Sequence, residues 1–355
     1  REIEGGFPNL PPGCHLELER VARDHVLAQI KNTLGKLNEF VPEAIRSFPA
    51  ETGKELTFRN FVEATDLSPV DLLQKKTWSE WKDLAHRTRT VDDPDLPDAR
   101  KAMSRVALRT DPDFLDGSRR ALTAAVEEPP AAYGLSEPAG VALHYLLWGK
   151  PGRAVGVADF QESLRRFKRN ETARRDLAEV IDWRLSVHPY PTRPIDLPTA
   201  PGLRLHAAYG YREVMAHFGQ ATFEGSGTTG VGVVRLKESR TYLHFLTFRK
   251  EERDFAPTTR YKDYPITPGR LHWESQVTTT QDSCRGQDYL RFRERGCTIL
   301  FFARMEKKEN GATSPFLFLG PASDLLHYEA NRPIQMIWQL AHPMPAALFE
   351  SARAV

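Results

Sequence analysis

The chain has 355 residues, and its hydrophobic content of 40% and charged content of 27% are ordinary for a globular protein. The formal net charge of +2 favours no particular class of partner. No run of about 18 apolar residues occurs, which argues against a helix that spans a membrane.

The three cysteines, Cys14, Cys284 and Cys297, are widely spaced and form no CxxC pair. This spacing argues against a zinc site or a disulfide framework, and it favours a reducing, cytoplasmic setting. The chain begins at Arg1 without a methionine, and residues 1–13 are rich in glycine and proline. We therefore expect a linker at the start of a piece cut from a longer protein.

Residues 1–200 are predicted to form a helical connector. Between His15 and Leu37 the apolar residues Val26, Ile30, Leu34 and Leu37 recur at helical spacing, which predicts one long amphipathic helix able to pack internally or to dimerise. Ser68-Pro69 is a typical helix start, and Thr77 with Glu80 makes a capping box. Further helices are predicted over residues 112–127, 140–148, 159–169 and 172–185.

Residues 201–355 are predicted to be rich in β-strands, after a stiff linker with five prolines between His188 and Pro201. A short helix is predicted over residues 211–218. Alternating or continuous apolar runs predict strands over residues 203–209, 231–236, 242–248, 271–277, 297–305, 316–319 and 334–340. The expected fold class is therefore α+β, with a helical connector followed by a small mixed β-barrel or a strongly curled sheet.

The stretch from Asp254 to Gln276 is unusually rich in aromatic and hydrogen-bonding residues for a segment that contains three prolines. It is typical either of a binding pocket or of a rigid loop whose aromatic rings close the end of a barrel. In a pocket, the stacking candidates are Phe255, Tyr261, Tyr264 and Trp273. The candidates for polar contacts to a base are Asp263, His272, Ser275 and Gln276, and those for phosphate contacts are Arg260, Lys262 and Arg270.

This combination suits a base swung out of a DNA duplex. Such a base needs aromatic faces to stack on and polar groups that read its Watson–Crick edge. Stacking contributes roughly 1–3 kcal/mol per base, which can offset an extrusion cost of a few kcal/mol. A carboxylate such as Asp263 could accept a hydrogen bond from the amino group of cytosine.

Several catalytic motifs are absent from the sequence, namely the P-loop, HExxH and GxSxG. Asp263 and Glu274, the latter in an E-x-Q run, could instead hold Mg²⁺ against a phosphate, as in metal-dependent nucleases. That pattern is short and common by chance. We therefore expect neither a metal nor another cofactor, and no catalysis by this chain.

Several runs resemble a domain of unknown function that ends many bacterial superfamily-two helicase proteins. Those in the second half are Leu203–Gly219, Lys250–Gln276, Gly296–Arg304, Phe316–Ala322 and Pro333–Phe349. Two runs in the first half, Gly5–Glu19 and Leu56–Leu73, look like the segment that follows the helicase core in the same proteins.

Among the proteins that it resembles are SauUSI-like type IV restriction enzymes, which act in phage defence. The resemblance implies a nuclease and an ATP-driven helicase elsewhere in the parent chain, here followed by a connector and a domain similar to SRA and PUA-like readers of modified bases. It implies recognition of 5-methylcytosine or 5-hydroxymethylcytosine in double-stranded DNA. The alternative from the residues alone is a dimerisation or protein-interaction module.

Overall fold

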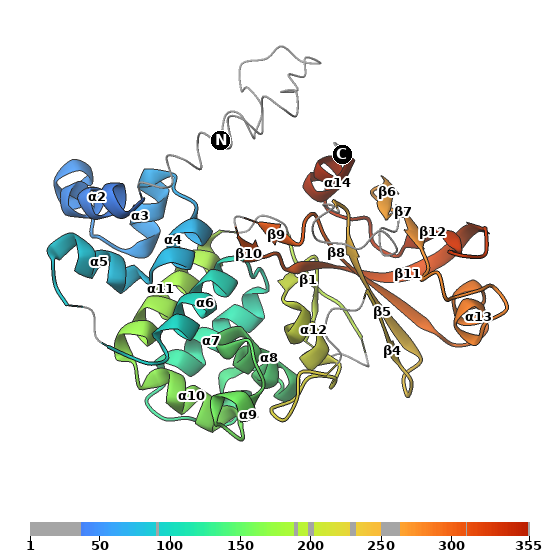
Figure 1. The fold of residues 1–355 in the computed structure, drawn as a ribbon, viewed down its shortest axis with the longest axis horizontal. Helices are drawn as coiled ribbons and strands as arrows, with labels where there is room; N and C mark the ends of the chain where they lie inside the picture. The colour runs from blue at the N-terminus through green and yellow to red at the C-terminus, as the bar shows by residue number, and fades with distance from the viewer. Residues whose placement is uncertain are drawn as a thin grey trace, which may run out of the picture. The chain divides into compact units, whose positions relative to one another are not determined.

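The structure is a computed structural model that describes residues 37–89, 92–187, 191–197, 202–227, 232–249, 263–309 and 311–353 (Figure 1). The linker predicted over residues 1–13 and the helix predicted between His15 and Leu37 lie outside this part, apart from Leu37 itself. The chain divides into two compact units. One comprises the residues up to 56 together with 81–89, and the other comprises 57–80 with 90–355.

The smaller unit contains α2 (Leu37–Thr52) and the end of α5 (Trp78–His86). Val41, Ile45 and Phe48 recur at helical spacing on α2 and are buried. The guanidinium of Arg46 donates a hydrogen bond to the carbonyl oxygen of Ala85 at 2.9 Å. A conventional amphipathic contact therefore holds this unit together.

The larger unit begins with helices, as predicted. They are α3 (Phe58–Thr65), α4 (Pro69–Lys75), the start of α5, α6 (Leu96–Ala107), α7 (Pro112–Thr123), η1 (Pro130–Tyr133), α8 (Glu137–Trp148), α9 (Gly152–Val155), α10 (Phe160–Lys168) and α11 (Glu171–Ser186). Both helix starts predicted from caps are confirmed. The Ser68 hydroxyl accepts a hydrogen bond from the Asp71 amide, and Thr77 and Glu80 cap each other reciprocally.

The second part of the larger unit holds the strands and three more helices. The helices are α12 (Tyr211–His217), α13 (Cys284–Leu290) and α14 (Ala346–Arg353). The strands are β1 (Arg193–Pro194), β2 (Arg204–Leu205), β3 (Ala208–Tyr209), β4 (Val233–Leu236), β5 (Thr241–Thr247), β6 (Tyr264–Thr267), β7 (Arg270–Glu274), β8 (Thr298–Arg304), β9 (Lys308–Glu309), β10 (Ala312–Thr313), β11 (Phe316–Glu329) and β12 (Gln335–Leu340).

The main sheet has the order β4-β5-β8-β11-β12-β7-β6, and β3 also pairs with β11. Only β5 and β8 run parallel among its described pairs. The 14-residue strand β11 pairs first with β8 and then with β12, and its register shifts around Gly320, at φ +85°, and again after Ala322. Such bulges bend a strand, so β11 curls the sheet.

The predicted barrel is wrong, because the described edge strands β4 and β6 do not pair with each other. Each has only four residues, and Pro265 in β6 offers no N–H for a further ladder. The alternative of a curled mixed sheet fits the structure. The predicted strand over 203–209 is also interrupted, since His206 adopts a left-handed conformation at φ +62°.

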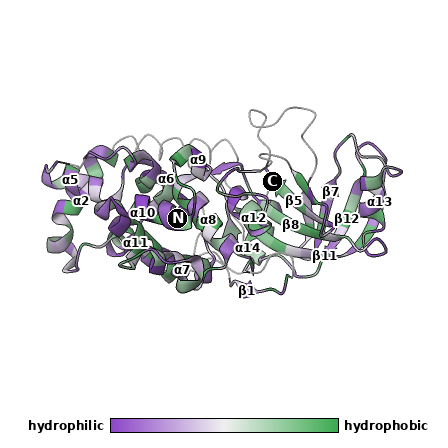
Figure 2. Ribbon diagram, turned by 90° about the horizontal axis from the view of Figure 1, so that it is seen from below, coloured by the Kyte–Doolittle hydropathy of each residue, from purple (hydrophilic) through white to green (hydrophobic). Residues whose placement is uncertain are grey.

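The core of this part lies against the sheet, where β5 and β8 form the most apolar strands (Figure 2). Ile299, Leu300 and Phe301 on β8 are completely buried, as the continuous apolar run predicted. Helix α13 adds Tyr289 to the same core. Within the described ranges, no helix combines the length and the apolarity needed to cross a lipid bilayer.

A buried ion pair joins the helices to the β-rich part. The guanidinium of Arg109, just after α6, donates to both carboxylate oxygens of Glu213 on α12, at 2.6 and 2.7 Å. Both residues are nearly inaccessible to solvent. Gly210 precedes α12, and a Cβ there would lie 2.6 Å from each partner, so a larger residue would displace the ion pair. Nearby, the Tyr209 hydroxyl donates to the Asp111 carboxylate.

We expect Arg109→Met to lower the free energy of unfolding by about 3–5 kcal/mol, because the Glu213 carboxylate would be left buried without its partner. Urea unfolding at neutral pH measures this change. Arg119→Met is the matched control, since Arg119 and Asp182 form an exposed pair and its loss should change stability by less than about 1 kcal/mol. Equal effects of the two substitutions would contradict the role of the buried pair.

Candidate functional site

The predicted site residues that the structure describes lie on the β6–β7 hairpin and in the segment that follows it. Strand β6 is at the edge of the sheet, and β7 pairs on its other side with β12. Phe255, Arg260, Tyr261 and Lys262 lie outside the described residues. The hairpin therefore presents the second half of the predicted aromatic stretch at the border of the sheet.

Tyr264 and His272 form a stacked pair on one face of this hairpin. They lie opposite each other in the β6–β7 register, which places their side chains on the same face. Their ring centroids are 4.6 Å apart and the ring planes differ by only 12°. His272 is buried, whereas 46% of Tyr264 is exposed. A flat ring supported from one side in this way is a platform on which another planar group can stack.

Two carboxylates accompany the stacked pair. Glu274 is two residues beyond His272 on β7, so it lies on the same face. The backbone amide of Glu274 donates a hydrogen bond to the Asp263 carboxylate at 3.4 Å. The side-chain amide of Gln335 donates to the carboxylate of Glu274 at 3.3 Å. Both carboxylates are buried. We call Tyr264, His272 and Glu274, with Asp263 beside Glu274, the hairpin face. Strand alternation places the first three on one side, whereas Asp263 precedes β6 and is placed by its contact with the Glu274 amide.

The hairpin face combines a stacking surface with hydrogen-bond acceptors, which suits a planar ligand that carries an amino group. The described residues contain no group of three or more His, Cys, Asp or Glu side chains placed to hold a metal ion. Two carboxylates alone make a poor metal site, since Mg²⁺ prefers octahedral coordination by oxygen atoms. The Mg²⁺ alternative therefore gains no support from this arrangement.

Trp273 points away from the hairpin face into the core. Its ring centroid lies 4.2 Å from that of His244 on β5 and 5.3 Å from that of Tyr289 on α13. Tyr289 and His244 also contact each other, with ring centroids 5.5 Å apart. The aromatic candidates from the sequence are thus divided between the two faces of β7, and we call Trp273, His244 and Tyr289 the inner cluster.

The inner cluster contains buried polar atoms without partners. Within the described part of the chain, the two ring nitrogens of His244 make no hydrogen bond, and the hydroxyl of Tyr289 makes none either. Burial, with a smaller contribution from the charge of Arg285, lowers the pKa of His244 to about 3. The imidazole is therefore neutral at physiological pH. Such atoms are uncommon in folded proteins because each one destabilises the native state.

The remaining predicted residues have different positions. Ser275 is completely buried, and it exchanges two hydrogen bonds with the backbone of Ile334, so its visible role is to fasten the end of β7. The side chain of Gln276 accepts a hydrogen bond from Arg285 at 2.5 Å. Arg270 is exposed at the turn end of β7, roughly 13 Å along the strand from Glu274.

His244, Tyr289 and Arg285 were missed by the sequence reasoning. His244 is the one nitrogen-bearing side chain in the otherwise apolar and hydroxyl-bearing strand Thr241–Thr247, and this interruption of a buried run was an available signal. Tyr289 and Arg285 lie on α13, a seven-residue helix that the sequence did not predict. Its length is too short for a helical periodicity to be recognised.

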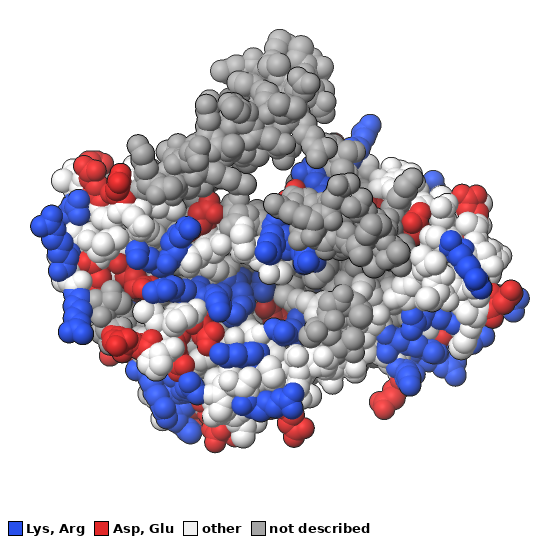
Figure 3. Space-filling view, in the orientation of Figure 1, with Lys and Arg blue, Asp and Glu red and all other residues white. Residues whose placement is uncertain are grey.

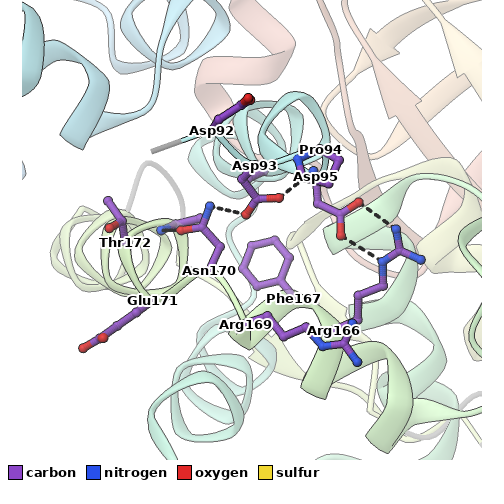
Figure 4. A pocket seen from close by; sticks show the side chains of 12 residues that line it. Asp92, Asp93, Pro94, Asp95, Arg166, Phe167, Arg169, Asn170, Glu171 and Thr172 are labelled. Atoms are coloured by element: carbon purple, nitrogen blue, oxygen red, sulfur yellow. Dashed lines mark hydrogen bonds and ion pairs between the residues drawn. The ribbon is translucent and has the colours of Figure 1, made fainter. Parts of the chain in front are cut away.

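A cleft of about 660 Å³ lies elsewhere, between the start of α6 and the α10–α11 turn (Figure 4). Two contacts between its lining residues cross it. Arg166 donates to both oxygens of Asp95 at 2.8 Å, and the Asn170 side chain donates to Asp93 (Figure 4). Hydrogen bonding to Arg166 lowers the pKa of Asp95. These contacts hold the turn in place, which is a structural role.

The comparisons with known proteins bear on the β-rich part. Residues 203–352 match the family model of a domain of unknown function, DUF3427. A search of curated proteins finds no match. The matched range includes both the hairpin face and the inner cluster.

His244→Phe should leave the free energy of unfolding at pH 8 within about 1 kcal/mol of the parent value, or raise it, because the orphaned nitrogens disappear. His144→Phe is the matched substitution. His144 is equally buried, but its nitrogens bond to the Ser163 hydroxyl at 2.7 Å and to the Lys150 carbonyl at 2.9 Å. Its loss should therefore destabilise by about 1–3 kcal/mol.

The same two variants give a test of pH dependence. The pKa values of His244 and His144, about 3 and about 4, lie below the ordinary 6.5, so the unfolded chain binds more protons below pH 6.5. Through each histidine, the free energy of unfolding is therefore highest above pH 6.5. It decreases as the pH falls below 6.5, by at most about 1.4 kcal/mol per pH unit. Urea unfolding from pH 8 to pH 4 should show a shallower loss in each variant. An unchanged slope for His244→Phe would contradict burial of a neutral imidazole.

Proposed function

We propose that this chain is a DNA-binding module that recognises 5-methylcytosine or 5-hydroxymethylcytosine, with the extruded base stacked on Tyr264. The observation that carries the proposal is the hairpin face. It combines an exposed aromatic ring, stacked on His272, with the buried carboxylate of Glu274 on the same strand face and with the buried carboxylate of Asp263, next to Tyr264 in the chain. A base reader needs these two elements, a stacking surface and groups that meet the base edge.

The stacking geometry suits a planar base. The Tyr264 ring is held nearly parallel to His272, so little rotational freedom is lost when a second ring stacks on it. Stacking of a base on an aromatic side chain contributes roughly 1–3 kcal/mol. That gain is of the size needed to offset the cost of unstacking one nucleotide.

The carboxylates supply selectivity between pyrimidines. Cytosine presents an N4 amino donor where thymine presents an O4 acceptor. A carboxylate of Asp263 or Glu274 accepts a hydrogen bond from the first and repels the second. On this proposal, cytosine and its 5-substituted forms fit the hairpin face better than 5-methyluracil, which is thymine.

The charge distribution supports a polyanionic partner. Figure 3 shows Lys and Arg side chains gathered where the β4–β5 hairpin lies beside α13. The exposed cations of these segments are Arg235, Lys237, Arg240, Arg291, Arg293 and Arg295. Asp288 neutralises part of this charge through ion pairs with Arg235 and Arg295. The remaining excess would attract the phosphates of DNA without regard to sequence.

The wider proposal follows the resemblance described from the sequence. The chain would be the non-catalytic specificity module of a cytoplasmic helicase–nuclease restriction protein, with an SRA-like reader in residues 201–355 and a connector in residues 1–200. The match of residues 203–352 to DUF3427 coincides with the reader half of this division. The nuclease and helicase activities would belong to other parts of the parent protein.

The test compares binding of one duplex in unmodified, 5-methylcytosine and 5-hydroxymethylcytosine forms at a single fixed salt concentration, because salt strongly changes such affinities. We expect tighter binding of a modified form. Tyr264→Ala should weaken it by about 5- to 100-fold through the lost stacking. Asp263→Asn should reduce the preference for cytosine over thymine at the same position.

Phe40→Ala serves as the control, since Phe40 is an aromatic side chain of similar exposure, 50%, on α2 of the smaller unit. It should leave the affinity unchanged. Equal affinity for the three duplexes would overturn recognition of a cytosine mark. An absence of DNA binding, together with a stable dimer in solution, would support the protein-interaction alternative instead.

A further inference from the structure

A second cleft, of about 480 Å³, lies beside the start of α14. It is lined on one side by Pro191–Arg193, at the start of β1, and by His206 between β2 and β3. On the other side it is lined by Pro345, Ala346 and Ala347. Neither the hairpin face nor the inner cluster contributes to it. All of its lining residues belong to the larger unit.

The start of α14 offers unused hydrogen-bond donors to this cleft. The amide of Phe349 donates to the Pro345 carbonyl at 3.1 Å, which makes Pro345 the residue before the first helical turn. The N–H groups of Ala346 and Ala347 therefore have no acceptor inside the helix. Proline has no side-chain oxygen to cap them, and both alanines are exposed. The helix dipole adds partial positive charge at this end.

His206 provides an independent sign that the cleft holds a ligand. Only 7% of the residue is exposed, and its Nε2 atom makes no hydrogen bond within the described part of the chain. Its amide donates to the Phe318 carbonyl at 2.8 Å, so the left-handed backbone at this position is fixed by the sheet. A buried nitrogen without a partner destabilises the fold unless a ligand or water satisfies it.

One cationic side chain lines the cleft with His206. It is the exposed Arg193, whose guanidinium donates to Nδ1 of His342 at 3.4 Å. Burial, together with the nearby charge of Arg193, lowers the pKa of His206 to about 4, whereas a hydrogen bond to the Pro343 backbone acts in the opposite direction. An anion in the cleft would offset this positive charge and favour protonation of His206.

We propose that this cleft binds a phosphate group through the N–H groups of Ala346 and Ala347, the guanidinium of Arg193 and the imidazole of His206. Amide groups at a helix start and an arginine fork are the donors that phosphate oxygens prefer in proteins. A bound anion favours the protonated form of His206, in which Nε2 also carries a proton and can donate. The phosphate belongs either to a nucleic-acid backbone or to a small phosphorylated molecule.

The position favours the backbone of DNA, and this part of the inference rests on the proposed function. The Met344 amide, just before α14, donates to the Pro268 carbonyl in the turn of the β6–β7 hairpin at 2.8 Å. The cleft thus adjoins the turn end of the hairpin that carries Tyr264. A strand whose base stacks on Tyr264 would have neighbouring phosphates within reach of this end.

The first experiment uses no DNA. The melting temperature of the 355-residue chain is measured in sodium phosphate and in sodium chloride at equal ionic strength and pH. Bound phosphate should raise it by mass action, and Arg193→Gln and His206→Asn should lose most of that increment. Asparagine tolerates the left-handed backbone of residue 206, so the second variant should fold.

Arg175→Gln, which changes an exposed arginine on α11, should keep the full increment. It also measures the general stabilisation that phosphate gives to any protein by exclusion from its surface. An equal increment in the parent chain and in all three variants would overturn the phosphate cleft. That result would leave the proposed base recognition untouched.

The second experiment separates the two sources of phosphate. With DNA, Arg193→Gln should lower the affinity for unmodified and modified duplexes alike, by roughly tenfold. It should also reduce the slope of log affinity against log salt by about one. An unchanged slope, with the phosphate increment lost, would assign the cleft to a small phosphorylated molecule and overturn the DNA-backbone source. Loss of the preference for modified DNA alone would contradict a backbone contact.

Discussion

The buried pair between Arg109 and Glu213 is the contact on which the placement of the β-rich part depends. It fixes α12 to the end of α6, and the adjacent Tyr209–Asp111 hydrogen bond fixes β3 at the same joint. Tyr209 in turn pairs with Phe316 at the start of β11. Because breaking a buried ion pair is costly even where forming it gains little, this joint acts mainly to select one arrangement of helices and sheet.

Strand β11 connects this joint to the β6–β7 hairpin through its pairing with β12. Its first residues pair with β8 and β3, and its last residues pair with β12, which holds β7 in register. The bulges near Gly320 and after Ala322 set how far the sheet curls between these partners. The hairpin face is therefore positioned by the long strand, while the short edge strand β6 adds the exposed ring of Tyr264.

Local signals predicted much of this fold, because caps and periodicity act within a few residues. The starts of α4 and α7, the β4–β5 hairpin and the buried strand β8 follow from residues that are neighbours in sequence. Sheet closure, by contrast, depends on the bends of β11 and on which edges meet. The site was predicted only in part, since alternation along β7 separates Trp273 from His272, and His244 joins Trp273 from a distant strand.

His244 and His206 both have buried ring nitrogens without a hydrogen bond, but their surroundings differ. His244 lies wholly inside the core among aromatic rings, where satisfying its nitrogens would require the inner cluster to admit a polar group. His206 lines a cleft together with Arg193 and the exposed residues Ala346 and Ala347 at the start of α14, so a ligand can reach it without rearrangement of the core. Natural proteins retain such destabilising groups where function needs them, and stability is then recovered elsewhere. If the hairpin face binds the base and the cleft at α14 binds a phosphate, specificity and sequence-independent affinity reside in separate groups, the first on the β6–β7 hairpin and the second at the start of α14. Substitutions that affect only one of the two are then possible.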